Sequence, residues 1–330
     1  GSAQLVNRLP MDPDNVVIAQ VNPLSLSSNY YLYNLRNDET TLLFKGSGRT
    51  SPGLFHPRTG ELLTRTELEG AGVDEYEQRI EIKSPDTGQF ERHDPLTTKL
   101  TARRNVSIVG IDEATGKYYV LSDKSSDLVQ AWMYDPKTRK FDSEPLLAEP
   151  NYSISGLIFG TQPSNFNKVL GFTVSGPQEI EVYVDPRMKA IQDALKKSFP
   201  GQSVRIESYN NDLSRVLVST ESASEPPAFH VLMDGKEVRT LGSERPWIKP
   251  AQIGEQRWVT YQARDGLKIP AILDLPAGWK KSDGPLPAIV HPHGGPWARD
   301  YAGWDRSGWV PFLTSRGYAV LRPNYRGSEG

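Results

Sequence analysis

The feature that most constrains the fold is a strand-and-turn unit that recurs about every 50 residues. In each unit an aromatic or β-branched run precedes a polar turn, as in 78–83 followed by 84–88. Corresponding positions are Tyr33, Ile82, Tyr134, Tyr183 and Leu232, which are 49, 52, 49 and 49 residues apart. Such a period with several strands per unit is typical of β-propeller blades. The spacing predicts a mostly β chain with five blade-like units, and an ordinary β-sandwich is the alternative.

Composition agrees with a globular chain of many short strands. Glycine and proline supply 28 and 26 of the 330 residues, which favours frequent turns. The 38 basic and 40 acidic side chains leave a net charge of −2, so we expect no nucleic-acid or membrane partner. No apolar run approaches the roughly 18 residues of a membrane span. The lack of cysteine excludes disulfides, thiolate metal ligands and a cysteine nucleophile.

One segment departs from the strand pattern. Met188, Ile191 and Leu195 share one helical face, and Pro186 stands at the first turn. Pro200-Gly201 follows the end of the pattern. We expect a short amphipathic helix, inserted between blade strands, that serves packing rather than binding.

An α/β pattern begins near residue 250. The expected strands are 258–263, 268–275, 287–291 and 317–322, and the expected helix is 309–316. Asp265-Gly266 is expected to form a two-residue hairpin turn, and the apolar run 287–291 suits a strand buried on both faces of a sheet. The order strand, helix, strand opens an α/β domain, yet about 75 residues are too few to close its core.

The chain therefore divides into a partial β-propeller, residues 1–250, and the beginning of an α/β domain, residues 251–330. We expect the remainder of the same polypeptide to complete the second domain.

The segment His293-Gly294-Gly295 follows the expected buried strand at 287–291 and carries the clearest chemical signal. Two glycines let the backbone turn sharply and approach a ligand closely. Pro296 favours an extended Gly295, which would aim its N–H in a defined direction. A loop of this kind at this position supplies a backbone N–H to the oxyanion hole of α/β-hydrolases. A tight structural turn is the alternative.

Several segments resemble the prolyl oligopeptidase family of serine peptidases, in particular its acylaminoacyl-peptidase and dipeptidyl-peptidase branch. They are VTYQARDG at 259–266, HGGPWARD at 293–300, RGYAV at 316–320 and NYRGS at 324–328. The resemblance is dense over residues 257–330. It implies a propeller of seven or eight blades that caps an α/β-hydrolase domain, so two or three N-terminal blades would be absent from this sequence.

The resemblance also implies where the catalytic groups lie. Gly295, with Gly294 as a second candidate, would donate to the oxyanion, and His293 would order the loop. The family's Ser/Asp/His triad would lie beyond residue 330, because no G-x-S-x-G occurs here and Gly327-Ser328-Glu329-Gly330 lacks that spacing. This chain alone would then be inactive.

Four aromatic residues follow the glycine loop: Trp297, Tyr301, Trp304 and Trp309. We assign Trp297 and Tyr301 to substrate binding, and packing between domains explains the group as well.

Weaker candidates lie elsewhere. His291 and His293 are two apart at a strand end, as metal ligands can be, but no third ligand is near in sequence. Asp74, Glu75 and Glu77 form an acidic loop. Dipeptidases of the family hold the substrate amine with propeller glutamates, whereas a solvated loop is the simpler interpretation here. We expect neither a metal nor an organic cofactor.

The sequence thus favours a serine peptidase that hydrolyses short peptides through an acyl-enzyme, with the propeller gating access. An esterase, an isopeptidase of the lasso-peptide type and a non-catalytic binding propeller are the alternatives. The location is open between a bacterial cytoplasm and periplasm, and homo-oligomerisation is open too.

Overall fold

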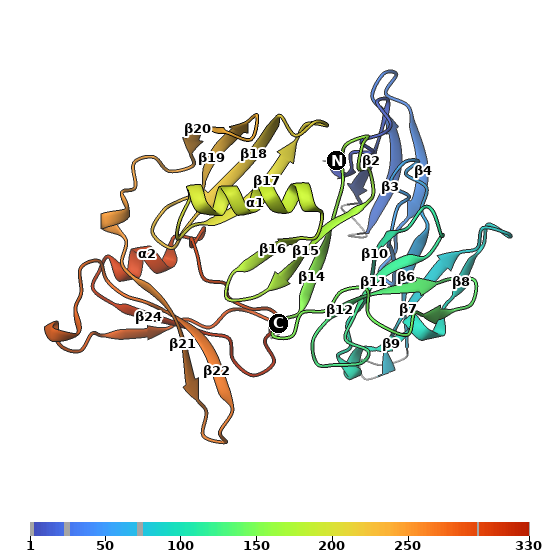
Figure 1. Ribbon diagram of the computed structural model, residues 1–330. Helices are drawn as coiled ribbons and strands as arrows, with labels where there is room; N and C mark the ends of the chain where they lie inside the picture. Colours follow the sequence, from blue (N-terminus) through green and yellow to red (C-terminus); the bar gives the residue numbers. More distant parts are fainter. Residues whose placement is uncertain (1–2, 23–26, 71–74, 296, 330) are drawn as a thin grey trace. The chain divides into compact units, whose positions relative to one another are not determined.

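The computed structural model describes residues 3–22, 27–70, 75–295 and 297–329. The protein is mostly β, with 43% strand and 10% helix, as the sequence predicted. It divides into two compact units, Gly1–Val169 (unit 1) and Leu170–Gly330 (unit 2), each described separately (Figure 1). The predicted boundary at residue 250 is a division by domain type, and it stays a prediction.

Unit 1 is built from small antiparallel sheets whose strands pair in chain order. The first sheet holds β1 (Ala3–Asn7), β2 (Asn15–Val21), β3 (Ser28–Asn34) and β4 (Thr40–Lys45). The second holds β5 (Thr50–Pro52), β6 (Thr64–Glu69), β7 (Glu77–Lys83) and β8 (Phe90–Arg92), with β9 (Thr98–Lys99) beside β7. The third holds β10 (Val106–Ile111), β11 (Tyr118–Ser122), β12 (Gln130–Asp135) and β13 (Lys140–Phe141). The next strand in the chain, β14 (Ile154–Phe159), is not part of this sheet. Two 3₁₀ turns, Asp94–Leu96 and Leu100–Ala102, flank β9.

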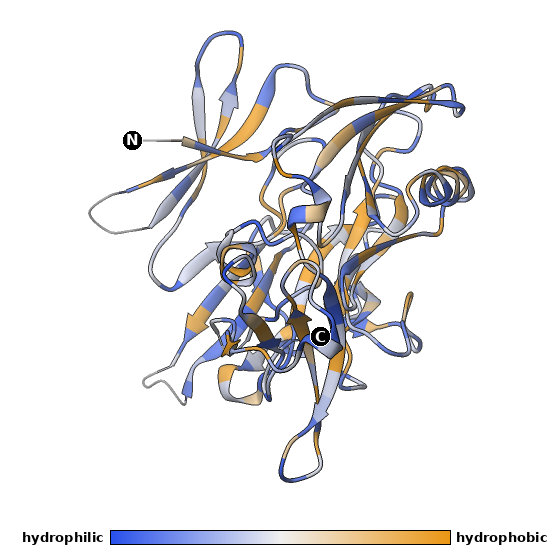
Figure 2. Ribbon diagram, turned by 90° about the vertical axis from the view of Figure 1, so that its left-hand side faces the viewer, coloured by the Kyte–Doolittle hydropathy of each residue, from blue (hydrophilic) through white to orange (hydrophobic). Residues whose placement is uncertain are grey.

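Side chains that alternate along the strands form the core of unit 1. In β7, for example, Ile80 and Ile82 are buried and the residues between and beside them are not. Hydrophobic and hydrophilic residues follow one another along many of the strands (Figure 2). Ile80 and Ile82 pack with Leu96 and with residues of the third sheet, including Val120. A half-buried strand of this pattern fixes its register, because a slip by one residue would expose its apolar side chains.

Unit 2 begins with an antiparallel pair and a helix. β15 (Val169–Ser175) pairs with β16 (Glu179–Tyr183), and α1 (Pro186–Ser198) packs on β16 and β17 (Figure 1). A four-stranded antiparallel sheet follows, made of β17 (Ser203–Tyr209), β18 (Arg215–Glu221), β19 (Ala228–Met233) and β20 (Glu237–Ser243). The 3₁₀ turn Pro250–Gln252 leads out of it.

The predicted helix is confirmed as α1, and a side-chain cap explains where it begins. The Asp185 carboxylate accepts hydrogen bonds from the backbone N–H groups of Arg187 and Met188, both at 3.0 Å. Met188 and Leu195 are buried, and the Gln192 amide donates to the carbonyl of Glu181 at 2.8 Å. The helix is therefore a packing element, as expected.

The repeat markers all fall on strands, namely β3, β7, β12, β16 and β19. The described sheets in residues 3–141 and 203–243 each use strands consecutive in sequence, with short connections. That arrangement is typical of propeller-type proteins and differs from a sandwich, in which Greek-key connections mix distant strands.

The last sheet of unit 2 has the mixed topology expected from residue 250 onward. Its order is β21 (Gln256–Gln262), β22 (Lys268–Asp274), β24 (Ala319–Pro323) and β23 (Ala288–Val290). β23 and β24 are parallel, and α2 (Trp309–Thr314) lies between them in the chain. A 3₁₀ turn, Lys281–Asp283, precedes β23. The predicted strand, helix, strand order is confirmed.

Two details differ from the sequence expectations. The β21–β22 hairpin has a three-residue loop, Arg264–Gly266, closed by a hydrogen bond from Ala263 N–H to the Leu267 carbonyl at 2.8 Å, with Gly266 at φ +89°. A glycine in the left-handed region lets a type I turn close this loop with a bulge, so the two-residue turn was wrong. Val290 in β23 is 63% exposed, and among the described residues β23 pairs with β24 alone, so the expected burial on both faces is not found.

Within the described residues, no helix is long and apolar enough to cross a membrane.

His230 on β19 should make unit 2 sensitive to mild acid. Its ring nitrogens lie 3.0 Å from Thr220 Oγ1 and 3.1 Å from Thr240 Oγ1, and burial lowers the pKa of His230 below 6.5. As the pH falls through about 6.5, the unfolded chain therefore takes up this proton before the folded chain does. The free energy of unfolding should fall between pH 7.5 and pH 5.5. Replacement by glutamine, His230→Gln, should flatten that slope in urea titrations, and equal slopes would contradict the assignment.

Candidate functional site

The HGG loop leaves the end of β23, where His291 N–H donates to the Leu321 carbonyl at 2.8 Å. Gly295 has φ +136°, a conformation that residues with a Cβ rarely adopt. A Cβ there would also come within 2.9 Å of the Trp297 backbone nitrogen, whereas one at Gly294 would meet nothing within 4 Å. Gly295 is thus the position in this loop that requires glycine.

His293 ties the loop to the segment that follows β24. Its Nδ1 lies 2.8 Å from the Gly294 carbonyl oxygen, and its Nε2 lies 2.7 Å from Ser328 Oγ. A carbonyl can only accept, so Nδ1 carries the proton and the Ser328 hydroxyl donates to Nε2. The His293 ring stacks on Tyr325 with centroids 4.5 Å apart, and the Tyr325 hydroxyl donates to the His293 carbonyl at 2.8 Å.

These contacts fix the direction of one backbone donor. The Gly294 carbonyl and the Gly295 N–H belong to the same peptide plane. A hydrogen bond from His293 Nδ1 to that carbonyl therefore also orients the Gly295 N–H. His293 acts here as the ordering residue that the sequence suggested.

A second set of contacts holds the two motifs side by side. Asp300 N–H donates to the Asn324 side-chain oxygen at 2.8 Å, and the Asn324 amide donates back to the Asp300 carbonyl at 3.0 Å. Glu329 N–H donates to the Ala298 carbonyl at 3.0 Å. These bonds hold residues 298–300, just after the glycine loop, against residues 324–329.

The two predicted substrate-binding aromatics lie in different surroundings. Trp297 is 60% exposed beside the loop. The Tyr301 hydroxyl donates to Ser175 Oγ at 3.2 Å, and the Arg299 guanidinium lies 4.9 Å over the Tyr301 ring. Arg299 also donates to the carbonyls of Ser175 and Gly176 at the end of β15. Tyr301 is therefore engaged in joining the loop to β15, and Trp297 is the more accessible of the two.

Of the other aromatics in the predicted group, Trp304 is buried and Trp309 is exposed.

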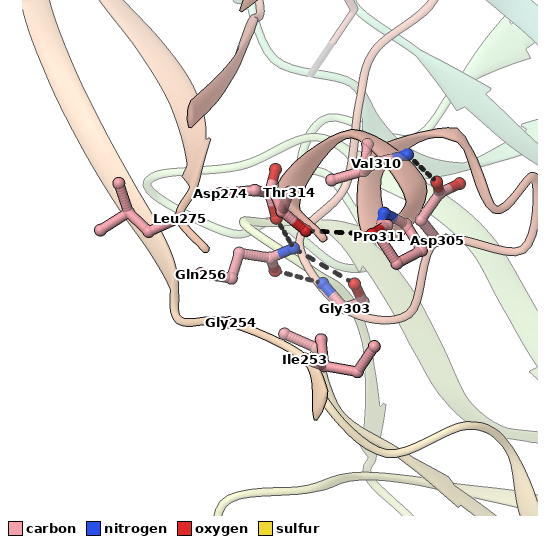
Figure 3. A pocket seen from close by; sticks show the side chains of 11 residues that line it. Ile253, Gly254, Gln256, Asp274, Leu275, Gly303, Asp305, Val310, Pro311 and Thr314 are labelled. Carbon is pink, nitrogen blue, oxygen red and sulfur yellow. Dashed lines mark hydrogen bonds between the residues drawn. The ribbon is translucent and has the colours of Figure 1, made fainter. Parts of the chain in front are cut away.

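Buried polar side chains anchor the other end of the loop, and Figure 3 shows Gln256 and Asp274 of this group beside Gly303. Arg322 of β24 pairs with Asp274 of β22, with Nε 3.0 Å from Oδ2 and both side chains less than a tenth exposed. The Gln256 amide donates to Asp274 at 2.7 Å, and its oxygen accepts from Gly303 N–H at 2.7 Å. Three strands and the 293–303 loop are thereby joined through one carboxylate and one amide.

The structure adds no support for the acidic loop or for a metal site as functional candidates. Asp74 lies outside the described residues, Glu75 is exposed, and Glu77 lies 3.5 Å from Arg79 and 3.8 Å from Arg92. No group of three or more metal-ligating side chains occurs in the described parts of the chain. Both His293 nitrogens already have partners.

Sequence reasoning assigned no role to Ser328, Tyr325 or Asn324. The available signal was their position in NYRGS directly after a strand parallel to the one that carries the HGG loop. Since the carboxyl ends of parallel strands meet at one edge of a sheet, residues following them come together.

The Asp274–Arg322 pair yields a stability prediction. Replacing Asp274 by alanine leaves a buried guanidinium without its carboxylate, which typically costs about 3–5 kcal/mol. The urea midpoint, followed by tryptophan fluorescence, should fall accordingly. The exposed pair Arg257–Glu255 supplies a control, because Glu255→Ala should leave the midpoint nearly unchanged. An apolar double replacement, Asp274→Leu with Arg322→Met, should be milder than Asp274→Ala, and a harmless Asp274→Ala would contradict the role of the pair.

Comparison with known proteins gives relatives of one kind. No family model matches the chain. It is 29% identical over 241 residues to dipeptidyl aminopeptidase BIII of Pseudoxanthomonas mexicana, covering 71% of this chain and 30% of that protein. It is 33% identical over 177 residues to dipeptidyl peptidase family member 6 of Caenorhabditis elegans, covering 46% of this chain and 24% of that protein.

Solved structures give the same picture for the fold. Dipeptidyl peptidase 4 of Porphyromonas gingivalis superposes with a TM-score of 0.57 at 14% identity, over 99% of this chain and 52% of that one. A puromycin hydrolase superposes with a TM-score of 0.60 at 18% sequence identity, over 100% of this chain and 50% of that one. The chain spans about a quarter to a half of the length of these proteins. These relatives and structural neighbours confirm the resemblance of the chain to the prolyl oligopeptidase family.

Proposed function

We propose that the chain is part of a longer serine peptidase of the prolyl oligopeptidase type. In this proposal residues 1–250 form five blades of a propeller, and residues 251–330 begin the α/β-hydrolase domain. The observation that carries it is the Gly295 loop, in which His293 holds the Gly294 carbonyl at 2.8 Å. Peptidase relatives at 29% and 33% identity support the reaction class.

The role of Gly295 follows from the chemistry of acyl transfer. When a serine attacks a peptide carbonyl, negative charge develops on the carbonyl oxygen. A backbone N–H already oriented toward that oxygen stabilises the charge without reorganising during the reaction. The nucleophile, its histidine base and the carboxylate belong, in this proposal, to the remainder of the polypeptide, and no cofactor takes part.

The open edge at β23 supports the same remainder as a partner. Val290 is 63% exposed, and β23 is bonded only to β24 within the described part of the chain. An unpaired edge with an apolar side chain is a place where another strand adds. The next strand of the parent's sheet would cover it.

Short peptides are the proposed substrates, with the propeller restricting access. The relatives named dipeptidyl peptidases favour removal of dipeptides. An esterase or an isopeptidase on the same scaffold is the second candidate, because an oxyanion donor serves any acyl group. A panel of dipeptidyl amides, acyl esters and isopeptides assayed with the intact protein would separate them.

The Ser328–His293 hydrogen bond raises a rival assignment, in which Ser328 is itself the nucleophile. Against it, His293 Nδ1 donates to a neutral backbone carbonyl, which stabilises an imidazolium less than a carboxylate does. We expect a fluorophosphonate probe to leave the 330-residue chain unlabelled. The intact parent should be labelled at a serine beyond residue 330. Mass-spectrometric detection of the adduct on Ser328 would overturn this assignment.

The role of the Gly295 N–H can be tested by a substitution that shifts its position, because a backbone N–H cannot be removed by truncating a side chain. Gly295→Ala puts a Cβ 2.9 Å from the Trp297 nitrogen at φ +136°, so the loop must shift. Loss of one oxyanion donor typically lowers kcat by about 10²–10³. In the intact protein kcat should fall by about that factor with little change in KM.

A matched glycine supplies the control. Gly242 in β20 has nothing within 4 Å of its would-be Cβ, so Gly242→Ala should retain wild-type kcat. Thermal unfolding of both variants checks that the fold is kept. Wild-type kcat in folded Gly295→Ala would remove Gly295 from the site.

A further inference from the structure

Unit 1 contains a cavity of about 940 Å³ that the proposed reaction does not use. Its walls come from the second and third sheets, at the hairpin turns 84–88, 115–116 and 136–139. The volume lies in the range of small-molecule sites, roughly 300–1,000 Å³.

Two buried polar side chains line this cavity with atoms that lack partners. Tyr118 is 4% exposed, and its hydroxyl makes no hydrogen bond with any described residue. His93 is 3% exposed, and its Nδ1 lies 2.8 Å from the Tyr134 hydroxyl. The His93 Nε2 has no protein partner among those residues either. Both side chains line the cavity, so an occupant can hydrogen-bond to these atoms.

The charges around the cavity are already balanced. Lys83 Nζ lies 2.6 Å from Glu61, and Arg139 lies 2.7 Å from Glu91. Lys137 and Asp86 add one charge of each sign to the lining. Three basic and three acidic side chains give no net attraction for an ion.

The two unpartnered groups are themselves uncharged near neutral pH. Burial, with the nearby Arg139 charge, lowers the pKa of His93 below 6.5. Burial also raises the pKa of Tyr118 to about 12, so its hydroxyl keeps the proton. A phenol donates more readily than it accepts, so Tyr134 O–H donates to His93 Nδ1 and Nε2–H is left as a donor. The cavity thus offers two neutral donors, Tyr118 O–H and His93 Nε2–H.

Apolar side chains make up much of the remaining wall. Leu63, Ile82 and Ile111 line the cavity together with the Tyr118 ring. They favour a ligand whose body is apolar and whose polar atoms are few.

We propose that this cavity binds a small uncharged molecule with two carbonyl oxygens and an apolar side chain, as in a blocked short peptide. One carbonyl accepts from Tyr118 and the other from His93. The cavity stands independently of the proposed reaction, which guides only the choice of the peptide probe.

The test is a binding titration of the full chain by calorimetry. The probe is N-acetyl-leucyl-alanine amide, and the free dipeptide leucyl-alanine and methyl α-glucoside are the comparison ligands. The blocked peptide should bind at least tenfold more tightly than either. Tyr118→Phe should raise its Kd about 3- to 10-fold, the effect of one hydrogen bond. Because the hydroxyl has no protein partner, this variant should unfold no earlier than the wild type.

The neighbouring tyrosine gives the matched control. Tyr119 packs on Phe159 with ring centroids 5.5 Å apart and does not line the cavity, so Tyr119→Phe should leave Kd unchanged. Tighter binding of the glucoside or of the free dipeptide would overturn the ligand class. No heat of binding for the blocked peptide at 10 mM, or equal Kd values in Tyr118→Phe and wild type, would overturn the site. None of these readouts involves peptide hydrolysis, so they are separate from a failure of the proposed reaction.

Discussion

The buried pair Asp274–Arg322 is the interaction on which the architecture around the HGG loop depends. It joins β22 to β24 at 3.0 Å, and Gln256 extends it to Gly303. Desolvating two charges is expensive, and a buried pair often adds little net stability. Its effect here is geometric: a one-residue slip of β24 would separate the guanidinium from the carboxylate and leave the pair broken. The pair therefore selects one register for β24, the strand that precedes residues 324–329.

The register of β24 also determines where the residues that orient the Gly295 N–H lie. β24 delivers Asn324, which is bonded in both directions to Asp300. Ser328 then reaches His293 Nε2, and His293 Nδ1 holds the Gly294 carbonyl. The Ser328 hydroxyl favours the His293 tautomer with the proton on Nδ1. The hydrogen bond from Nδ1 to the Gly294 carbonyl then orients the peptide plane that carries the Gly295 N–H. A donor fixed in this way loses little entropy when an oxyanion forms, which is the physical basis of its proposed catalytic value.

The sequence predicted those features that depend on local patterns. The marker strands, α1 with Pro186 at its start, and the strand, helix, strand order after residue 250 follow from periodicity and turn residues. What it missed depends on distant partners. Ser328 and His293 are 35 residues apart, and no local pattern announces their contact. The exposure of Val290 could not be read from an apolar run, because periodicity says nothing about which strands lie on either side.

The two candidate sites differ in how their donors are prepared. Around Gly295 the donor is a backbone N–H oriented by side chains that are themselves satisfied, so it suits charge that develops briefly during a reaction. In the proposed cavity site of unit 1 the donors are side chains, Tyr118 and His93, that line the cavity. A ligand that accepts from such donors gains its hydrogen bonds in the ground state. Such a group favours stable occupancy by a ground-state molecule. The physical chemistry therefore separates the proposed transition-state site at Gly295 from the proposed binding site in unit 1.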